Sequence, residues 1–75
     1  MNKYIVPIYD EVENNIKIKV LSATSLINAQ EKLINYLINT YEFDTDNFSD
    51  YQEFINYSYD AYNLLIGEIL DIEEI

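Results

Sequence analysis

The stretch that decides the fold is LLIGEILDI, residues 64–72. Its aliphatic residues continue a helical spacing that begins at Tyr51, which would give one helix of about 24 residues that carries Gly67 on its polar side at a cost of about 1 kcal/mol. The same stretch is rich in β-branched residues, and Gly67 also suits a bulge in a strand. A lone two-stranded hairpin is marginal in water, whereas a third strand stabilises it. We therefore favour a third strand here and keep the long helix as the alternative.

A run from Lys3 to Tyr9 predicts the first strand that such a segment would join. Apolar and aromatic residues fill both of its faces, with Tyr4, Val6 and Ile8 on one and Ile5, Pro7 and Tyr9 on the other. Pro7 has no N–H to donate, so this strand should lie at an edge of the sheet or carry a local irregularity.

A second strand follows after a polar, turn-like segment at residues 10–15. Apolar residues alternate with lysines over Ile16, Lys17, Ile18, Lys19 and Val20. This alternation is typical of a half-buried strand, and it predicts that the lysine face is the wet one. The two runs and the short segment between them predict an antiparallel hairpin.

Ser25 is a typical N-cap and should open the first helix. The apolar residues of this helix cover an arc of about 200°, against about 100° for an ordinary surface helix. They are Leu26, Ile27, Ala29, Leu33, Ile34, Tyr36, Leu37, Ile38 and Tyr41. Such a helix needs cover on two sides, which the hairpin and either the C-terminal half or a second copy of the chain could supply.

An acidic linker at about residues 42–48 is too polar to belong to the core. Ser49 with Gln52 then makes a capping box that opens a second helix. Residues at helical spacing along it are Tyr51, Phe54, Ile55, Ser58 and Tyr62. The predicted fold is α+β in the order β-β-α-α-β, one small domain over residues 1–75, with β-β-α-α and one long C-terminal helix as the alternative.

The composition excludes several kinds of chemistry. Cysteine, histidine, tryptophan and arginine are absent, which removes disulfides, zinc sites of the Cys/His type and Ser-His-Asp nucleophiles. The acids from Asp44 to Asp50 do not form an EF-hand calcium loop. Such a loop needs a ligand, a glycine and a glutamate at its fifth, sixth and twelfth positions, where this chain has Phe48, Ser49 and Ile55. A domain this small has little room for a catalytic cleft. We therefore expect neither an enzyme nor a metal or other cofactor.

The charge is divided unevenly along the chain. Residues 1–40 are neutral, with four acids and all four lysines, whereas residues 41–75 hold ten acids and no base and carry the whole net charge of −10. Such a field repels nucleic acid and anionic membranes and attracts basic protein surfaces. No apolar run approaches the ~20 residues of a membrane span, and the N-terminus does not resemble a signal peptide. We expect a cytoplasmic protein, although the acids could also serve solubility alone.

Two of the eight tyrosines are candidates for binding rather than packing. Tyr57 and Tyr59 fall on the flanks of the second helix beside acidic residues, and tyrosine is enriched at interface hot spots. A tyrosine next to an acid suits an arginine, through a cation–π contact and a charged hydrogen bond. The alternative is that both pad the rim of the core. The candidate partner-binding residues are Glu42, Asp44, Asp46, Asp50, Glu53, Tyr57, Tyr59 and Asp60.

A short, cysteine-free, strongly acidic chain that has lysine but no arginine resembles the small inhibitor proteins of phages and other mobile elements, of the anti-CRISPR and anti-restriction type. The resemblance implies a protein that binds in a nucleic-acid-binding groove of a host nuclease complex, in the host cytoplasm, with carboxylates in the place of phosphates. No motif aligns, so it transfers no residue's role. The alternative function is a small acidic accessory or assembly protein that homodimerises through its first helix.

Overall fold

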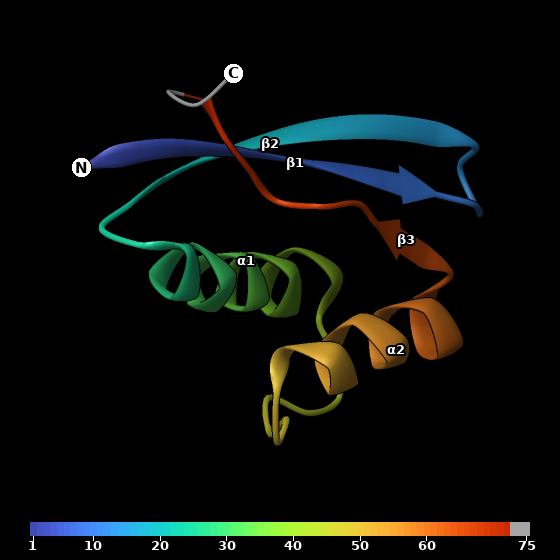
Figure 1. The fold of residues 1–75 in the computed structure, drawn as a ribbon. Coiled ribbons are helices and arrows are strands. Elements are labelled where there is room, and N and C mark those ends of the chain that lie inside the picture. Colours follow the sequence, from blue (N-terminus) through green and yellow to red (C-terminus); the bar gives the residue numbers. More distant parts are fainter. Residues whose placement is uncertain (73–75) are drawn as a thin grey trace.

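The computed structural model describes residues 1–72, and within them one sheet is covered on one side by two helices (Figure 1). The elements follow the predicted order, except that the returning strand is split into two short segments. Their bounds are β1 Asn2–Asp10, β2 Asn15–Ala23, α1 Leu26–Tyr41, α2 Tyr51–Tyr62, β3 Leu64–Ile66 and β4 Leu70–Asp71. The α+β prediction is confirmed, and the alternative of one long C-terminal helix is wrong.

The predicted hairpin pairs all nine residues of β1 with all nine of β2. Asp10 shapes the turn, because its buried carboxylate accepts hydrogen bonds from the backbone N–H groups of Val12 and Glu13 at 3.0 and 3.2 Å. Asn14 ends the turn in the left-handed region, with φ of 54°, which asparagine tolerates better than most residues. Local side-chain chemistry therefore sets both the turn and the hairpin register.

The alternation predicted for β2 is present, but its lysine face is not the wet face. Lys19 lies opposite Val6, which is completely buried under the helices. Directly opposed residues of an antiparallel pair share a face, so Lys19 and, two residues earlier, Lys17 lie on the helix side. The residues between and beside them point to the other side and are 50–65% exposed: Ile16, Ile18 and Val20.

The lysines remain solvated because they reach over helix α1 from the edge of the sheet. β2 is an edge strand, and the ammonium groups of Lys19 and Lys17 lie 4.2 and 5.8 Å from the ring centres of Tyr36 and Tyr41. Cation–π contacts of this kind are favourable, and the aliphatic stems cover apolar surface while the charges stay wet. Leu21 follows on the same face and is 6% exposed, so the core needs this face inward.

Helix α1 begins where Ser25 predicts, since the Ser25 side chain accepts from the N–H of Asn28 at 3.1 Å. Its central stripe is completely buried: Ala29, Leu33 and Leu37. Both flanks of the wide apolar arc pack at the margin of the core, with Tyr36 on one side and Ile34, Ile38 and Tyr41 on the other. Only the first turn leaves large apolar side chains exposed, with Leu26 at 47% and Ile27 at 69%. The sheet, the linker and α2 therefore cover most of the arc.

Helix α2 begins one residue later than its predicted capping box implies. Asp50, and not Ser49, is the N-cap, and its carboxylate accepts from the N–H of Glu53 at 2.8 Å. The Glu53 carboxylate reaches back to the Ser49 hydroxyl at 2.6 Å, so the reciprocal bonding of a capping box is present with different partners. Asn63 ends the helix in the left-handed region, with φ of 56°, which turns the chain into β3.

Pro7 and Gly67 explain why the returning strand is split. The sheet order is β2-β1-β3 and β4 also pairs with β1, so β1 is central and Pro7 marks an irregularity rather than an edge. Between the pairs Ile8–Ile66 and Ile5–Leu70, β1 has two residues where the returning strand has three. The N–H of Gly67 donates to the Pro7 carbonyl at 2.8 Å, so the backbone polar groups of Pro7 are directed toward the returning strand. The position where Pro7 lacks an N–H therefore faces this one-residue bulge, and no hydrogen bond to β2 is lost.

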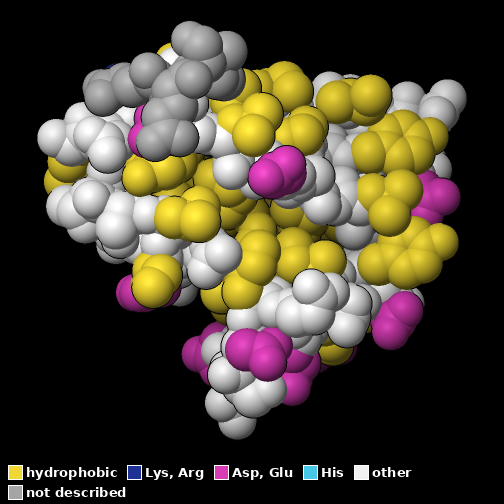
Figure 2. Space-filling model, viewed as in Figure 1, with side chains coloured by type: hydrophobic (Ala, Val, Ile, Leu, Met, Phe, Trp, Pro, Cys, Tyr) yellow, Lys and Arg dark blue, Asp and Glu magenta, His cyan; other side chains and the backbone are white. Residues whose placement is uncertain are grey.

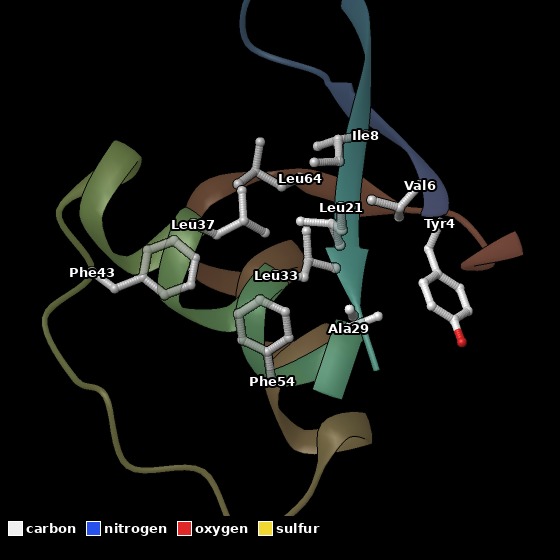
Figure 3. Close-up of a cluster of buried hydrophobic side chains, with 11 residues drawn as sticks. Tyr4, Val6, Ile8, Leu21, Ala29, Leu33, Leu37, Phe43, Phe54 and Leu64 are labelled. Atoms are coloured by element: carbon white, nitrogen blue, oxygen red, sulfur yellow. The ribbon is translucent and has the colours of Figure 1, made fainter. Parts of the chain in front are cut away.

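The core lies between the sheet and the helices, and every long element contributes to it (Figure 3). Val6 and Ile8 point from β1 toward Leu33 and Leu37 of α1, and Phe54 enters from α2. The C-terminal strand adds Leu64, which is 1% exposed. This core fixes the position of α2 and of the linker, on which most of the predicted binding residues lie.

Candidate functional site

The linker between the helices is held against α2 by an aromatic cluster. Phe43 was expected in a segment too polar for the core, but it is only 8% exposed, and its ring stacks on Tyr62 at 4.4 Å between centres and 7° between planes. The Tyr62 hydroxyl accepts from the N–H of Asp44 at 3.2 Å and donates to the Glu42 carbonyl at 3.4 Å. Phe48 packs edge-on against Phe54 farther along. The acidic side chains of this segment therefore project from an anchored backbone.

The linker runs back along α2, which places six acids on one border of the molecule. Asp44 is tied to Tyr62 at the C-terminal end of the helix, and Asp50 caps its N-terminal end. Glu53 and Asp60 are seven residues apart, so they lie on the same side of α2, about 10 Å from each other along its axis. We call this border the acidic edge: Glu42, Asp44, Asp46, Asp50, Glu53 and Asp60, all of them exposed.

The acidic edge has a charge density close to that of a nucleic-acid strand. Helix α2 has 12 residues, hence a length of about 18 Å, so the six carboxylates of the linker and the helix together average one charge per about 3 Å of helix axis, divided between two parallel segments. One strand of B-DNA carries one phosphate per about 3.4 Å. Figure 2 shows acidic side chains gathered on the lower part of the molecule, where Figure 1 places the linker and the start of α2.

Two of these acids also have a structural role that the sequence analysis did not assign. Asp50 and Glu53 satisfy the free N–H groups at the start of α2 and lie at the positive end of its dipole. Any partner that binds these two carboxylates therefore binds groups that also cap helix α2. The other four, at positions 42, 44, 46 and 60, make no such bond through their side chains within the part of the chain that is described.

The two candidate tyrosines do not share one surface. Tyr57 is half-buried, with its ring 5.5 Å from the rings of Phe43 and Phe48, whereas Tyr59 is 45% exposed. At 100° per residue, Tyr57 lies within about 60° of Glu53 and Asp60 around the helix, and Tyr59 lies about 100–120° from both. The structure therefore places Tyr57 at the rim of the core beside the acidic edge and Tyr59 on the opposite flank of α2.

Burial raises the pKa of the Tyr57 hydroxyl above its ordinary value, and the neighbouring Tyr62 and the charge of Asp44 act in the same direction. Burial also raises the pKa of Tyr51, to about 12. Both phenols therefore stay neutral at physiological pH, so the charge of the acidic edge comes from its carboxylates alone.

A second surface was missed by the sequence analysis, namely the side of the sheet that faces away from the helices. It carries Ile16, Ile18 and Val20, which were expected in the core. The signal was present in β1, where Ile5, Pro7 and Tyr9 make the second face as apolar as the first. A strand that is apolar on both faces indicates that something covers both.

Among residues 1–72 there is no group of three or more acidic side chains placed to hold a metal ion. None of the helices in the same range has the length and hydropathy to cross a membrane.

The fold and the site together define a small two-layer α+β domain with an acidic helical border and an apolar sheet face. Comparison with protein-family models, with curated proteins and with solved structures gives no match for this chain.

Proposed function

We propose that the protein is a non-enzymatic inhibitor that binds other proteins, encoded by a phage or another mobile element, and that its acidic edge occupies a basic nucleic-acid-binding groove of a host defence nuclease complex. The observation that carries this proposal is the charge density of the acidic edge, about one carboxylate per 3 Å on an anchored backbone. A groove that binds DNA is lined by lysine and arginine side chains, which pair with phosphates that follow one another at about 3.4 Å of helix axis along a strand.

The backbone anchoring supports a rigid mimic. Two hydrogen bonds of the Tyr62 hydroxyl and the stacked Phe43 ring hold the acidic linker in place before a partner arrives. A preorganised surface loses less conformational entropy on binding than a flexible acidic tail does. Inhibition by such a surface is stoichiometric, and electrostatic steering speeds association at low salt.

The test is competition with DNA. The protein is titrated into purified CRISPR nuclease–guide complexes and restriction nucleases, and displacement of a labelled duplex is measured at several salt concentrations. We expect displacement at a one-to-one ratio with at least one of these complexes and an affinity that falls as salt rises, because screening shortens the Debye length to about 8 Å at physiological ionic strength.

A matched pair of variants separates the acidic edge from net charge. The first carries Asp44→Asn, Asp46→Asn and Asp60→Asn, which leaves the capping residues intact. The control carries Glu11→Gln, Glu13→Gln and Glu31→Gln, three exposed acids in the neutral half. Both lose three charges. The edge variant should bind about tenfold or more weakly, or at least 1.4 kcal/mol, and the control should bind almost normally.

Equal losses in the two variants would show that only net charge matters, and the absence of displacement from every complex would contradict the proposed target. Tyr59→Ala adds a further distinction. Because Tyr59 lies on the flank of α2 away from the acidic edge, its loss should leave the affinity almost unchanged, whereas loss of the acidic side chains should mainly lower the association rate.

A further inference from the structure

The sheet has a continuous apolar surface on the side away from the helices. In the hairpin register, Ile5 lies opposite Val20, Pro7 opposite Ile18 and Tyr9 opposite Ile16; on the other side of β1, Tyr9 lies opposite Leu65 and Ile5 opposite Leu70. Opposed residues share a face, so these side chains form one surface. We call it the open face: Ile5, Pro7, Tyr9, Ile16, Ile18, Val20, Leu65 and Leu70.

The open face is the most exposed apolar surface of the sheet. Ile16 and Ile18 are 65% and 59% exposed, and no helix of residues 1–72 covers this side (Figure 1). The nine-residue strands are about 30 Å long and three strands span about 14 Å, so the face measures about 400 Å² in projection. Apolar patches of this size are as large as the largest on typical monomers, and they often serve as interaction sites.

The break in the returning strand hollows one end of the open face. A shallow apolar depression of about 270 Å³ lies there, lined by Pro7, Tyr9, Ile16, Leu65, Ile66 and Gly67. Because Gly67 has no side chain and β3 stops at Ile66, the surface dips beside Pro7. The open face thus has both projecting aliphatic side chains and a hollow of a size to accept one.

We infer that the open face binds a second copy of this chain, so that two sheets pack face to face as a two-fold symmetric dimer. This inference does not depend on the proposed inhibitory function. Aligned sheets pack about 10 Å apart with their side chains interdigitated, and a two-fold interface needs a surface that is complementary to itself. Aliphatic side chains beside an aliphatic hollow satisfy that requirement without any charge pairing.

The distribution of charge selects a second copy over a basic partner protein. The open face itself contains no acid, and the acidic edge lies in the helix layer behind the sheet. A basic partner would be drawn to the acidic edge and would bury unpaired charge against the open face, at a cost. A second copy approaches with the same acid-free face, on which Lys3 lies only at the margin, opposite Ser22, and the two acidic edges stay on opposite outer sides of the dimer.

The size of the face sets the strength of the dimer. Two such faces bury on the order of 1,000 Å² of accessible surface, which is at the low end for specific interfaces. We therefore expect a monomer–dimer equilibrium with a dissociation constant in the micromolar range. The sequence analysis assigned self-association to the first helix, but only Leu26 and Ile27 of that helix remain strongly exposed.

The experiment is sedimentation equilibrium of the whole chain at loading concentrations from about 1 µM to about 1 mM, a range that brackets micromolar affinity. The mass should rise from 8.9 kDa toward twice that value. Ile18→Lys, at the centre of the open face, should remain a monomer throughout. Ile27→Lys is the matched control, since Ile27 is also strongly exposed but lies on α1, and it should dimerise like the unchanged protein.

Amide and methyl NMR spectra supply a second readout and verify that each variant is folded. Dilution of the unchanged protein should shift the signals of the open face, with those of Ile16, Ile18 and Leu65 foremost, and leave those of α2 in place. A constant mass of 8.9 kDa at all concentrations, normal dimerisation of a folded Ile18→Lys, or loss of the dimer in Ile27→Lys would each overturn the inference. If Ile18→Lys does not fold, the dilution shifts alone decide the question.

Discussion

Gly67 is the residue whose replacement tests the fold most directly. A Cβ added at this position would lie 2.5 Å from Cγ and 3.2 Å from Cδ of Pro7. Both are ring atoms of a residue in the central strand, so neither can rotate away as the end of a flexible side chain could. The Gly67 backbone is not in the left-handed region, so its φ and ψ angles do not oppose an alanine. The only barrier to Gly67→Ala is the contact of the new Cβ with the Pro7 ring.

The expected magnitude follows from two opposing effects. Overpacking a closely packed site costs about 1–3 kcal/mol, whereas alanine in place of glycine restricts the unfolded chain and stabilises by about 0.4–1 kcal/mol where the backbone is compatible. We expect Gly67→Ala to lower the free energy of unfolding by about 1–2 kcal/mol. That is a large part of the total, which for 75 residues is about 4–11 kcal/mol.

The assay is urea unfolding followed by far-ultraviolet circular dichroism, with Pro7→Ala and the double variant completing a cycle. In the Pro7→Ala background both clashing atoms are gone, and the remaining neighbour is the carbonyl oxygen of residue 7 at 3.4 Å, an ordinary contact. There, Gly67→Ala should become neutral or stabilising. If it costs the same in both backgrounds, Pro7 is not the obstacle and the proposed match between proline and glycine is wrong.

The remaining predictions concern groups on α2. The Tyr51 hydroxyl is buried without a hydrogen-bond partner among residues 1–72, so Tyr51→Phe should raise the free energy of unfolding by about 1 kcal/mol in urea, and a loss would contradict this account. Because the folded-state pKa of Tyr51 is raised from 10.0 to about 12, the unfolded chain gives up this proton first, so stability is undiminished below pH 10 and falls as the pH rises toward 12; Tyr51→Phe should lose less stability over that range. Asp50→Ala should lower the thermal midpoint through loss of the cap, at about 1 kcal/mol, whereas Asp46→Ala should stay within about 0.5 kcal/mol; equal effects would refute the capping role.

The sequence was sufficient where the signals are local. Ser25 marks the start of α1 because its hydroxyl satisfies a free N–H of the first turn, whatever packs around it. An irregularity at Pro7 and a bulge at Gly67 were each predicted for a similar reason, since a proline removes a donor and a glycine permits close approach, but only the structure shows that the two face each other. The N-cap of α2 was misplaced by one residue because Ser49 and Asp50 are both good caps, and only the position of Glu53 decides between them.

The sequence was insufficient where the answer depends on packing between distant segments. The alternation in β2 fixes which residues share a face, but it does not say which face is covered. The buried Leu21 decides that, because the core formed with α1 needs it inward, and the lysines on its face are tolerated at the sheet edge over tyrosine rings. Likewise, the exposure of Asp44 and Asp46 was predictable, but their alignment with Asp60 depends on the anchoring of Phe43 against Tyr62.

The separation of the two surfaces bears on how the proposed activities could coexist. The acidic edge lies in the helix layer and the open face on the far side of the sheet, so a dimer formed through the open face leaves both acidic edges free. Two edges on one particle can bind two grooves of one assembly, and the second contact is then governed by effective concentration rather than by free concentration. The surfaces also respond oppositely to salt, because screening weakens charge pairing with a groove but relieves the repulsion between two chains of charge −10. A monomeric variant of the open face would therefore lose the gain from double contact while it keeps the affinity of a single acidic edge.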